Sequence, residues 1–514
     1  MQPSDRWSPL AVGGLFILFT ITAILNAGGY RHGVSDQAFY IPAILRHLDP
    51  ALFPRDWAML GAQDKFNVFT PILGSFVRVS GIPLPHLFLG LYLLGLCALC
   101  GAALGIGARL YRSRWTVIAL AAALTLRHAV AMGAVNTLEG YLHPRMLAFG
   151  AGALAVAACL GGRAPRALLL VAAAIALHPT TGAWFALWIG VALAIADRRF
   201  THPALALGAT TTAAGAWAVL AGPLSGRFTR MDDVWLSVLG SKTYLFPSEW
   251  PLGGWLPVVF TALVATWVYA VRRRQGLVTD AERGVAAGAA VLFAAFLFSI
   301  PFTAARIALA VQLQVPRTLW MVDLLAMVYA VWYLAESQPP AAGRQPRAER
   351  SAPATPPGTA PRERRPLVVA LVVVALALAR GGYALFVEHP ERALVQVDLP
   401  RNEWTDAMRW ITDNTPKDAW VLAASGHAWR YGTSVRVAAA RDVYLEEAKD
   451  TAMSMYSRDA AMTVLERIRR MQGFDAMTVE RLRGLGPDVL VIERQDLGLP
   501  VLYRNARFTV HSLR

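Results

Sequence analysis

LAVGGLFILFTITAILNAGG, residues Leu10–Gly29, is a run of about twenty residues without a single charged side chain. This is the length that an α-helix needs to cross the roughly 30 Å hydrocarbon core of a bilayer. Similar runs recur through about the first 390 positions of the 514-residue chain, which is 55% hydrophobic and 16% charged. A soluble protein of this size would carry about 25% charged residues. The sequence therefore predicts a polytopic α-helical membrane protein.

Eleven apolar runs are predicted to span the membrane. The first lacks a small-x-small cleavage site, so it is interpreted as a retained span rather than a signal peptide. The fifth and sixth are short and flank His178–Gly182, which favours two helices joined by a tight turn, with one broken span as the alternative. The predicted spans are 9–29, 84–107, 115–135, 145–161, 167–178, 183–196, 203–222, 253–271, 284–303, 317–335 and 367–387.

Arginines in the short loops predict the orientation. With the N-terminus inside, the arginine-rich loops after the second, fourth, sixth and eighth spans all fall on the cytoplasmic side, as the positive-inside rule requires. The C-terminus then lies outside. These loops account for most of the net charge of +15, so no nucleic-acid partner is expected.

Composition divides the chain into four regions. Residues 1–335 are predicted to form the transmembrane module, with a first outer loop at 30–83. Residues 336–366 are rich in Pro, Ala and Arg and are predicted to be a disordered cytoplasmic linker before the last span, 367–387. Residues 388–514 have a soluble composition and are predicted to form a small extracytoplasmic α/β domain, a lid or interaction unit without chemistry. Its expected elements are a helix at 402–413, strands at 419–425, 434–440, 488–494 and 508–513, and a helical region up to about residue 484.

The segment GVSDQAFYIPAILRHLDPALFPRDW, Gly33–Trp57, follows the first span directly. Its apolar residues at helical spacing predict an interfacial helix with the apolar face toward lipid. Pro42 fits only the first turn of such a helix, so Asp36 is expected just before it, near the membrane surface. Asp36 is either a capping carboxylate or a catalytic base. The residues on the apolar face are Tyr40, Ile41, Ile44, Leu45 and Leu48.

Ionisable side chains gather on the predicted outer face. Asp36 and Glu139 are the candidate catalytic residues, because a carboxylate suits a general base for an acceptor hydroxyl. Arg127 and His128 fall in the outer third of the third span, where an ionisable side chain is costly and usually functional. Basic side chains at this depth suit a lipid-linked phosphate. The candidate phosphate-binding residues are Arg127, Arg306 and Arg317, and the candidate acceptor or sugar contacts are His128, His143, Arg145 and His178.

Four stretches carry a resemblance to a known group: SDQAFYIPAI (35–44), LEGYLHPRM (138–146), MRWITDNTPKDAWVLAAS (408–425) and LPVLYRNARFTVHSL (499–513). With the span pattern, they resemble the GT-C glycosyltransferase superfamily, which includes protein mannosyltransferases and aminoarabinose transferases. The resemblance implies transfer of a sugar from a polyprenyl-phosphate donor, at the outer face of a bacterial cytoplasmic membrane, to an envelope glycan, lipid or protein. It also implies that Asp36 is the catalytic base and Glu139 the acid of the second outer loop.

Two departures from the family leave the cofactor open. Asp36 is followed by Gln37, where mannosyltransferases carry Asp-Glu, and the second loop has no Asp-x-Asp. The resemblance implies that the second-loop acid, here Glu139, corresponds to one that helps to hold a divalent metal in some relatives, so Mg²⁺ or Mn²⁺ is an alternative to catalysis without a metal. Two other functions also fit the outer charges: a transporter or flippase for a lipid-linked or anionic solute, and a non-catalytic envelope scaffold.

Overall fold

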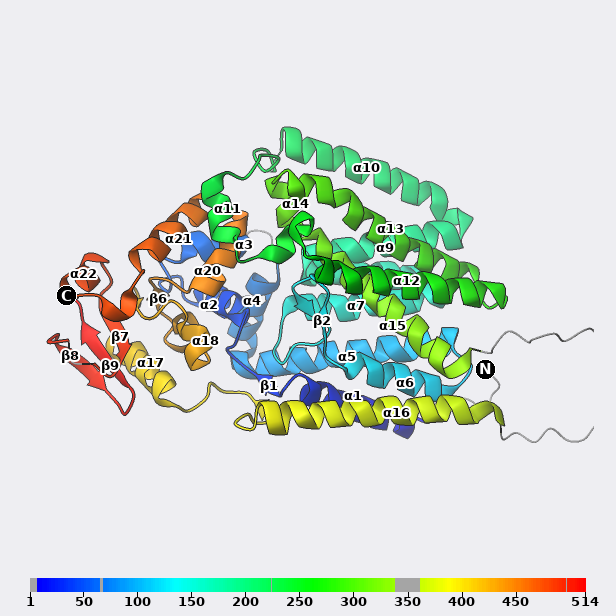
Figure 1. Ribbon diagram of the computed structural model, residues 1–514, viewed down its shortest axis with the longest axis horizontal. Helices are drawn as coiled ribbons and strands as arrows, with labels where there is room; N and C mark the ends of the chain where they lie inside the picture. The colour runs from blue at the N-terminus through cyan, green and yellow to red at the C-terminus, as the bar shows by residue number, and fades with distance from the viewer. Residues whose placement is uncertain (1–6, 65–67, 223, 338–360, 496) are drawn as a thin grey trace, which may run out of the picture.

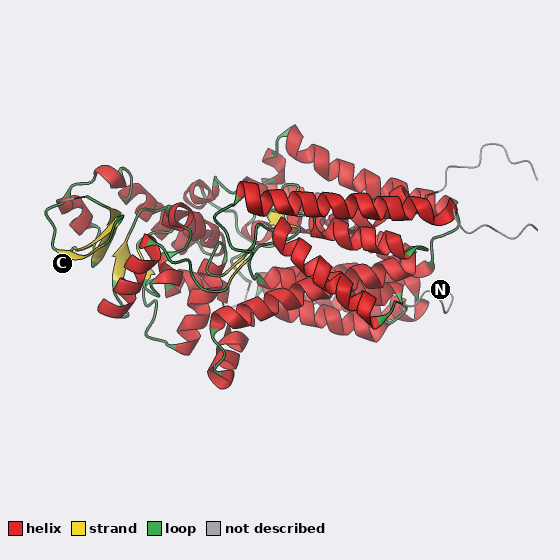
Figure 2. Ribbon diagram, turned by 90° about the horizontal axis from the view of Figure 1, so that it is seen from below, coloured by secondary structure: helices red, strands yellow, loops and turns green. Residues whose placement is uncertain are grey.

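The computed structural model describes residues 7–64, 68–222, 224–337, 361–495 and 497–514. Long helices run side by side along the long axis, and a five-stranded sheet lies at the opposite end of the molecule (Figure 1, Figure 2). Short helices and two small pairs of strands fill the region between the helix bundle and the sheet (Figure 1).

Each predicted span coincides with a helix over most of its length. Among the described residues, eight helices are long and apolar enough to cross a membrane, and three apolar helices are shorter. The long ones are α1 (Pro9–Asn26), α5 (Leu84–Leu110), α9 (Pro179–Ala196), α10 (Thr201–Leu220), α12 (Leu252–Arg274), α13 (Asp280–Ala304), α15 (Leu319–Glu336) and α16 (Pro361–Tyr383). The shorter ones are α6 (Arg114–Thr125), α7 (Pro144–Leu160) and α8 (Ala164–Leu177).

Helix α10 shows why this bundle belongs in a bilayer. It has no buried residue, although it is strongly apolar, and it lies at the edge of the bundle (Figure 1). Leu205, Trp217 and Leu220 are 66%, 61% and 81% exposed. An exposed apolar surface of this kind is unfavourable in water and suits hydrocarbon. The protein is a helical membrane protein.

Helices α8 and α9 form a tight hairpin, as predicted, and pack against each other. His178 is the only residue between them, and its ring accepts a hydrogen bond from the backbone N–H of Thr181, at 3.3 Å, at the start of α9. A Cβ atom at Gly182 would lie 2.3 Å from the backbone of Ile175. Only glycine allows this close approach of the two helices.

The third predicted span is too long. Helix α6 ends at Thr125, and the chain continues into a hairpin of β2 (Ala129–Val130) and β3 (Val135–Asn136). The backbone N–H of Thr137 donates to the carbonyl of His128, at 2.9 Å, so the polar backbone of this loop is paired with itself. Arg127 and His128 therefore lie in a loop rather than in the outer third of a helix, which corrects the prediction.

The first outer loop contains α2 (Gln37–Leu48), α3 (Trp57–Asp64) and α4 (Phe69–Ser80). The apolar face of α2 was predicted to contact lipid, and this is wrong. Tyr40, Ile41 and Ile44 are at most 4% exposed because α4 and other protein segments cover them. Pro42 lies inside α2 rather than in its first turn. Helical periodicity reports an apolar face but cannot distinguish protein from lipid as its neighbour.

Residues 395–514 contain a mixed sheet with the strand order β6-β5-β7-β9-β8. Strand β5 pairs in parallel with β6 and β7, and β9 is antiparallel to β7 and β8. The strands are β5 (Trp420–Leu422), β6 (Asp442–Val443), β7 (Val489–Glu493), β8 (Val501–Arg504) and β9 (Phe508–Ser512). The helices are α17 (Glu403–Asn414), α18 (His427–Tyr431), α19 (Val435–Ala438), α20 (Glu447–Met453), α21 (Arg458–Arg470) and α22 (Val479–Gly484).

The helix predicted at 402–413 is confirmed, and Asn402 caps it with a side-chain hydrogen bond. The strand predicted at 434–440 is wrong, since α19 occupies that segment. Ser434 caps α19 by accepting the backbone N–H of Arg436 at 3.1 Å. Val435 and Ala439, four residues apart, are both fully buried, so the apolar spacing fits a helical turn as well as a strand.

The sheet region and the outer loops share one core. Strand β1 (Tyr30–Arg31) pairs in parallel with β4 (Val395–Gln396). Side chains of α11 (Asp233–Leu239), including Trp235, form one buried cluster with Leu422 and Leu490 of the sheet. The sequence did not predict this shared core. Most of the predicted linker, residues 338–360, lies outside the described residues.

The remaining described elements are short. They are α14 (Ala308–Gln312), η2 (Arg198–Phe200), η3 (Thr243–Leu245), η4 (Pro247–Glu249), η5 (Val315–Thr318), η6 (Ala384–Glu388), η7 (Ser454–Tyr456) and η8 (Phe474–Ala476).

Candidate active site

Asp36 stands at the N-cap position of α2, but its carboxylate makes no cap hydrogen bond. Ser35 before it has a φ of 54°, in the left-handed region that a residue with a Cβ rarely adopts. Gln37 holds this turn, since its side chain accepts the N–H of Gly33 at 2.6 Å and donates to the carbonyl of Leu142 at 3.1 Å. The turn therefore directs Asp36 away from its own helix. Strained turns of this kind cluster at functional sites.

Three basic side chains surround the carboxylate of Asp36. Lys449 Nζ lies 2.7 Å from one oxygen, and His143 Nε2 lies 3.2 Å from the other. Arg145 is 3.5 Å from that second oxygen. Burial alone would raise the pKa of Asp36, but Lys449, the His143 hydrogen bond and Arg145 outweigh it and hold the pKa well below its ordinary value. Asp36 is therefore ionised in the structure described.

His143 is a neutral hydrogen-bond donor to Asp36. Its Nδ1 accepts the backbone N–H of Arg145 at 3.1 Å, so the ring proton is on Nε2, which faces Asp36. Burial, followed by the charge of Arg145, lowers the pKa of His143 to about 3. The ring thus fixes the orientation of the carboxylate without adding a charge.

Arg145 connects the two predicted catalytic acids. It is 3.0 Å from Glu139 and 3.5 Å from Asp36. Asn136 donates to the carboxylate of Glu139 at 3.3 Å. Glu139 and Arg145 are 4% and 5% exposed, so this pair is shielded from solvent. The segment that follows α1 and the segment that precedes α7 meet at this arginine.

Arg317 and Lys242 add positive charge to the site. Arg317, on η5, lies within electrostatic range of Arg145 and Asp36, and its buried Nε has no hydrogen-bond partner among the described residues. Lys242 donates to the carbonyl of Ala448, at 3.2 Å, next to Lys449. Burial and the nearby Lys449 lower the pKa of Lys242.

The buried and half-buried side chains around Asp36 carry more positive than negative charge. The cations are Arg145, Arg317, Lys242 and Lys449, and the carboxylates are Asp36 and Glu139. Tyr244 and Tyr456 line the same region, and the hydroxyl of Tyr456 accepts a hydrogen bond from Gln314 at 3.2 Å. An anion that enters this site would compensate the surplus charge.

Three predicted site residues lie apart from this cluster. Arg127 donates to the carbonyl of Leu138 at 3.2 Å, and His128 is 3.1 Å from Asp323. Arg306 pairs with Glu249 and stacks over Phe246. The structure thus brings together Asp36, Glu139, His143, Arg145, His178 and Arg317, with the ring centres of His143 and His178 6.2 Å apart.

Lys449 and Lys242 were not among the predicted site residues. The rarity of lysine could have identified them, because only four of the 49 basic residues are lysines, and two of these four lie near Asp36. Among the residues that the structure describes, no group of three or more His, Cys, Asp or Glu side chains is arranged to hold a metal ion.

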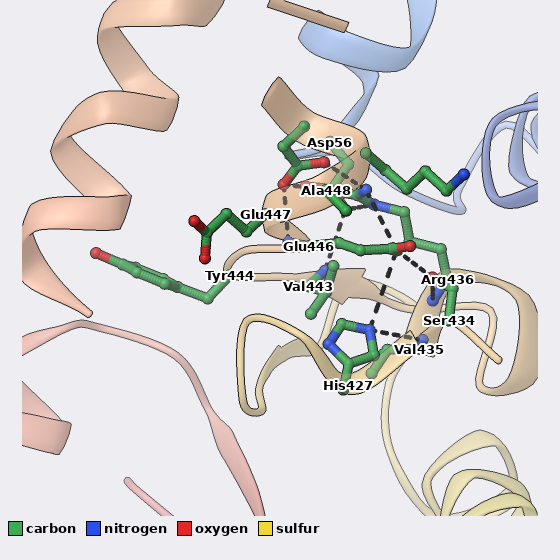
Figure 3. A network of polar contacts seen from close by, with 12 residues as sticks. Asp56, His427, Ser434, Val435, Arg436, Val443, Tyr444, Glu446, Glu447 and Ala448 are labelled. Atoms are coloured by element: carbon green, nitrogen blue, oxygen red, sulfur yellow. Dashed lines mark hydrogen bonds and ion pairs between the residues drawn. The ribbon is translucent and has the colours of Figure 1, made fainter. Parts of the chain in front are cut away.

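A second buried network includes residues at the start of α20 (Figure 3). Arg436 donates to Asp56 at 2.7 Å and to Asp450 at 2.7 and 3.2 Å. Ser434 donates to Glu446 in the same network. All of these side chains are at most 2% exposed. Asp56 belongs to the first outer loop, so the network joins that loop to the sheet region.

Asp442 makes this junction sensitive to pH. Its carboxylate accepts the backbone N–H groups of Asp56 and Arg55 at 2.9 and 3.1 Å. Burial, followed by the negative charge of Asp56, raises the pKa of Asp442 to about 6. A raised pKa means that the folded state binds the proton more tightly than the unfolded state. Protonated Asp442 therefore stabilises the folded protein. This stabilisation is fully present below pH 3.8, the ordinary pKa of the carboxyl, and is lost as the pH rises through about 6.

Asp442→Asn should therefore flatten the dependence of stability on pH. Between pH 4 and 6 the wild-type protein should lose up to about 1.4 kcal/mol per pH unit through this group, and the variant should not. Thermal unfolding of the full-length protein in detergent, followed by tryptophan fluorescence at several pH values, measures the slope. Asp475→Asn, at an exposed carboxylate, is the matched control. Parallel curves for wild type and Asp442→Asn would contradict the assignment.

No protein-family model matches the chain, and no curated protein matches it.

Proposed function

We propose that the protein is a GT-C-type membrane glycosyltransferase that takes a sugar from a polyprenyl phosphate at the outer face of a bacterial cytoplasmic membrane. The observation that carries the proposal is one ionised carboxylate, Asp36, set within a surplus of cations between the helix bundle and the sheet region. A carboxylate can accept the proton of an acceptor hydroxyl. Fixed cations can compensate the negative charge that develops on a phosphate leaving group.

The proposed reaction is a single displacement with inversion at the sugar. The acceptor oxygen attacks the anomeric carbon, and the bond from that carbon to the phosphate oxygen breaks. The electron pair leaves with the polyprenyl phosphate, and Asp36 accepts the proton from the acceptor hydroxyl. Arg317 is assigned to the donor phosphate because its buried Nε has no hydrogen-bond partner within the described part of the chain. Arg145 orients Asp36 while Glu139 balances its charge.

The cavity beside the site is too small to hold the lipid chain of the donor. A narrow apolar cavity between α5 and α7 reaches Glu139 and His143 and is lined further by Leu96 and Met146. Its volume is about 10 Å³, enough for about one water molecule. A polyprenyl chain is larger, so we infer that the chain stays in the bilayer and that side chains move when the phosphate binds.

The proposal includes eleven crossings, with the N-terminus inside and residues 388–514 outside. All eleven apolar runs form helices, and α1 ends beside β1, next to the outer loops, so α1 begins at the far end of the bundle (Figure 1). Cysteines placed at the exposed Arg274 and Asp475, in a background without the native cysteines, test this arrangement. From outside intact cells, an impermeant maleimide should label position 475 and spare position 274. Labelling at 274 would contradict the topology.

Reconstitution tests the function. The full-length protein is placed in liposomes with a labelled polyprenyl-phosphate hexose and an envelope fraction as the source of acceptor. Transfer of label from the lipid to the acceptor, with polyprenyl phosphate as the second product, is expected. Movement of the uncleaved lipid across the bilayer would instead favour the transporter. If neither transfer nor movement were observed, the non-catalytic scaffold would be favoured.

A further inference from the structure

Lys449 reaches Asp36 from the other end of the chain. It lies on α20, in the sheet region, 413 positions from Asp36 in the sequence. Its ammonium group is 2.7 Å from Asp36 and 5.5 Å from the ring centre of Phe39, and its side chain is 9% exposed. Burying an ammonium is costly unless it is paired, so this position is stabilised mainly by Asp36.

The buried network around Arg436 (Figure 3) fixes the helix that carries Lys449. Asp450, the next residue, is bound by Arg436 through both carboxylate oxygens, and it also accepts the backbone N–H of Glu446 at 2.9 Å. Arg436 is held in turn by Asp56 of the first outer loop. The start of α20 is therefore fixed relative to the loop that contains Asp36, while the Lys449 side chain has rotatable bonds beyond its Cα.

The contact leaves Asp36 unsuited to accept a proton. An ion pair with Lys449 stabilises the charged carboxylate and makes it a weaker base. Lys242 lies beside Lys449 and repels it, and the cations around Asp36 outnumber the carboxylates. An anion brought to Lys449 and Lys242 would compete with Asp36 for the ammonium group of Lys449.

We propose that Lys449 is a phosphate-binding residue that exchanges partners, leaving Asp36 for the phosphate of the donor lipid. This proposal rests on the proposed function and deepens it. Lys449 stays protonated throughout and no covalent bond changes. The exchange frees Asp36 to act as a base only while a donor is bound. The sheet region thus supplies a residue of the active site, rather than serving only as a lid.

Binding of farnesyl phosphate, a short prenyl phosphate, to the full-length protein in detergent tests the exchange. Lys449→Met should weaken binding by about tenfold or more, the usual value of one charge-assisted hydrogen bond. Asp36→Asn should strengthen binding, because it removes the carboxylate that competes for Lys449. In Asp36→Asn/Lys449→Met that gain should disappear. Lys417→Met, which breaks a Lys–Asp pair with Asp49 between the same two regions, should leave binding unchanged.

The double variant keeps the test decisive if Lys449→Met folds poorly, because it removes both partners and leaves neither charge unpaired. Lys449→Arg should retain most of the binding. Wild-type affinity in Lys449→Met, or a gain from Asp36→Asn that persists without Lys449, would overturn the proposal. Binding does not depend on turnover. If the variants bound farnesyl phosphate as expected but the protein transferred no sugar, the glycosyltransferase function would be refuted, whereas the phosphate-binding role of Lys449 would stand.

Discussion

Asp36→Asn should lower the rate of sugar transfer by about 10²–10⁴-fold, the usual effect of removing a general base. Asparagine keeps the size of the side chain and can still accept hydrogen bonds from His143 and Lys449, but it cannot take a proton at neutral pH. Affinity for the donor should not fall, because the carboxylate competes with the phosphate for Lys449. The loss should therefore lie in kcat rather than in KM.

The measurement is release of labelled sugar from its lipid carrier in liposomes, with equal amounts of folded protein. Asp49→Asn is the matched control, since Asp49 lies at the end of the same helix and is paired with Lys417, away from the site. That variant should retain activity. Turnover of Asp36→Asn close to that of the control would exclude Asp36 as the base.

Arg436→Met should destabilise the folded protein by about 3–5 kcal/mol, the range measured when one partner of a buried ion pair is removed. Arg436, Asp56 and Asp450 have no exposed side-chain surface. Methionine fills similar space, so the main cost is that the buried Asp450 and Glu446 lose this ion pair and Asp56 keeps only Arg467, at 3.9 Å. Burial already raises the pKa of Asp450 against the effect of Arg436, and loss of Arg436 should raise it further.

Thermal unfolding of the 514-residue protein in detergent should show a melting temperature lower by roughly 3–5 °C, because the entropy of unfolding scales with chain length. Arg409→Met is the control, because its ion pair with Asp406 is exposed and should contribute no more than about 1 kcal/mol. If Arg436→Met and Arg409→Met had the same melting temperature, the network would not hold the sheet region to the first outer loop. The position assigned to Lys449 would then lose its support.

Local sequence is sufficient to specify the helices of the bundle. An apolar run of about twenty residues has to satisfy its backbone hydrogen bonds internally in hydrocarbon, and a helix does so without help from distant residues. The predicted span 253–271 lies within α12, and 84–107 lies within α5. The pairing of Asp36 with Arg145 was also within reach, because Asp36 follows the first predicted span and Arg145 begins the fourth, on the same predicted side.

Only the tertiary structure decided what surrounds these elements. The apolar face of α2 has the same spacing whether protein or lipid covers it, and the residues around Val435 fit a strand as well as a helix. Lys449 looks like any solvated lysine of a polar helix until the fold places it 2.7 Å from Asp36. Local sequence encodes backbone hydrogen bonding and apolar spacing. The burial of a charge depends on contacts between residues some 400 positions apart, as for Arg436 and Asp56, and no local pattern records them.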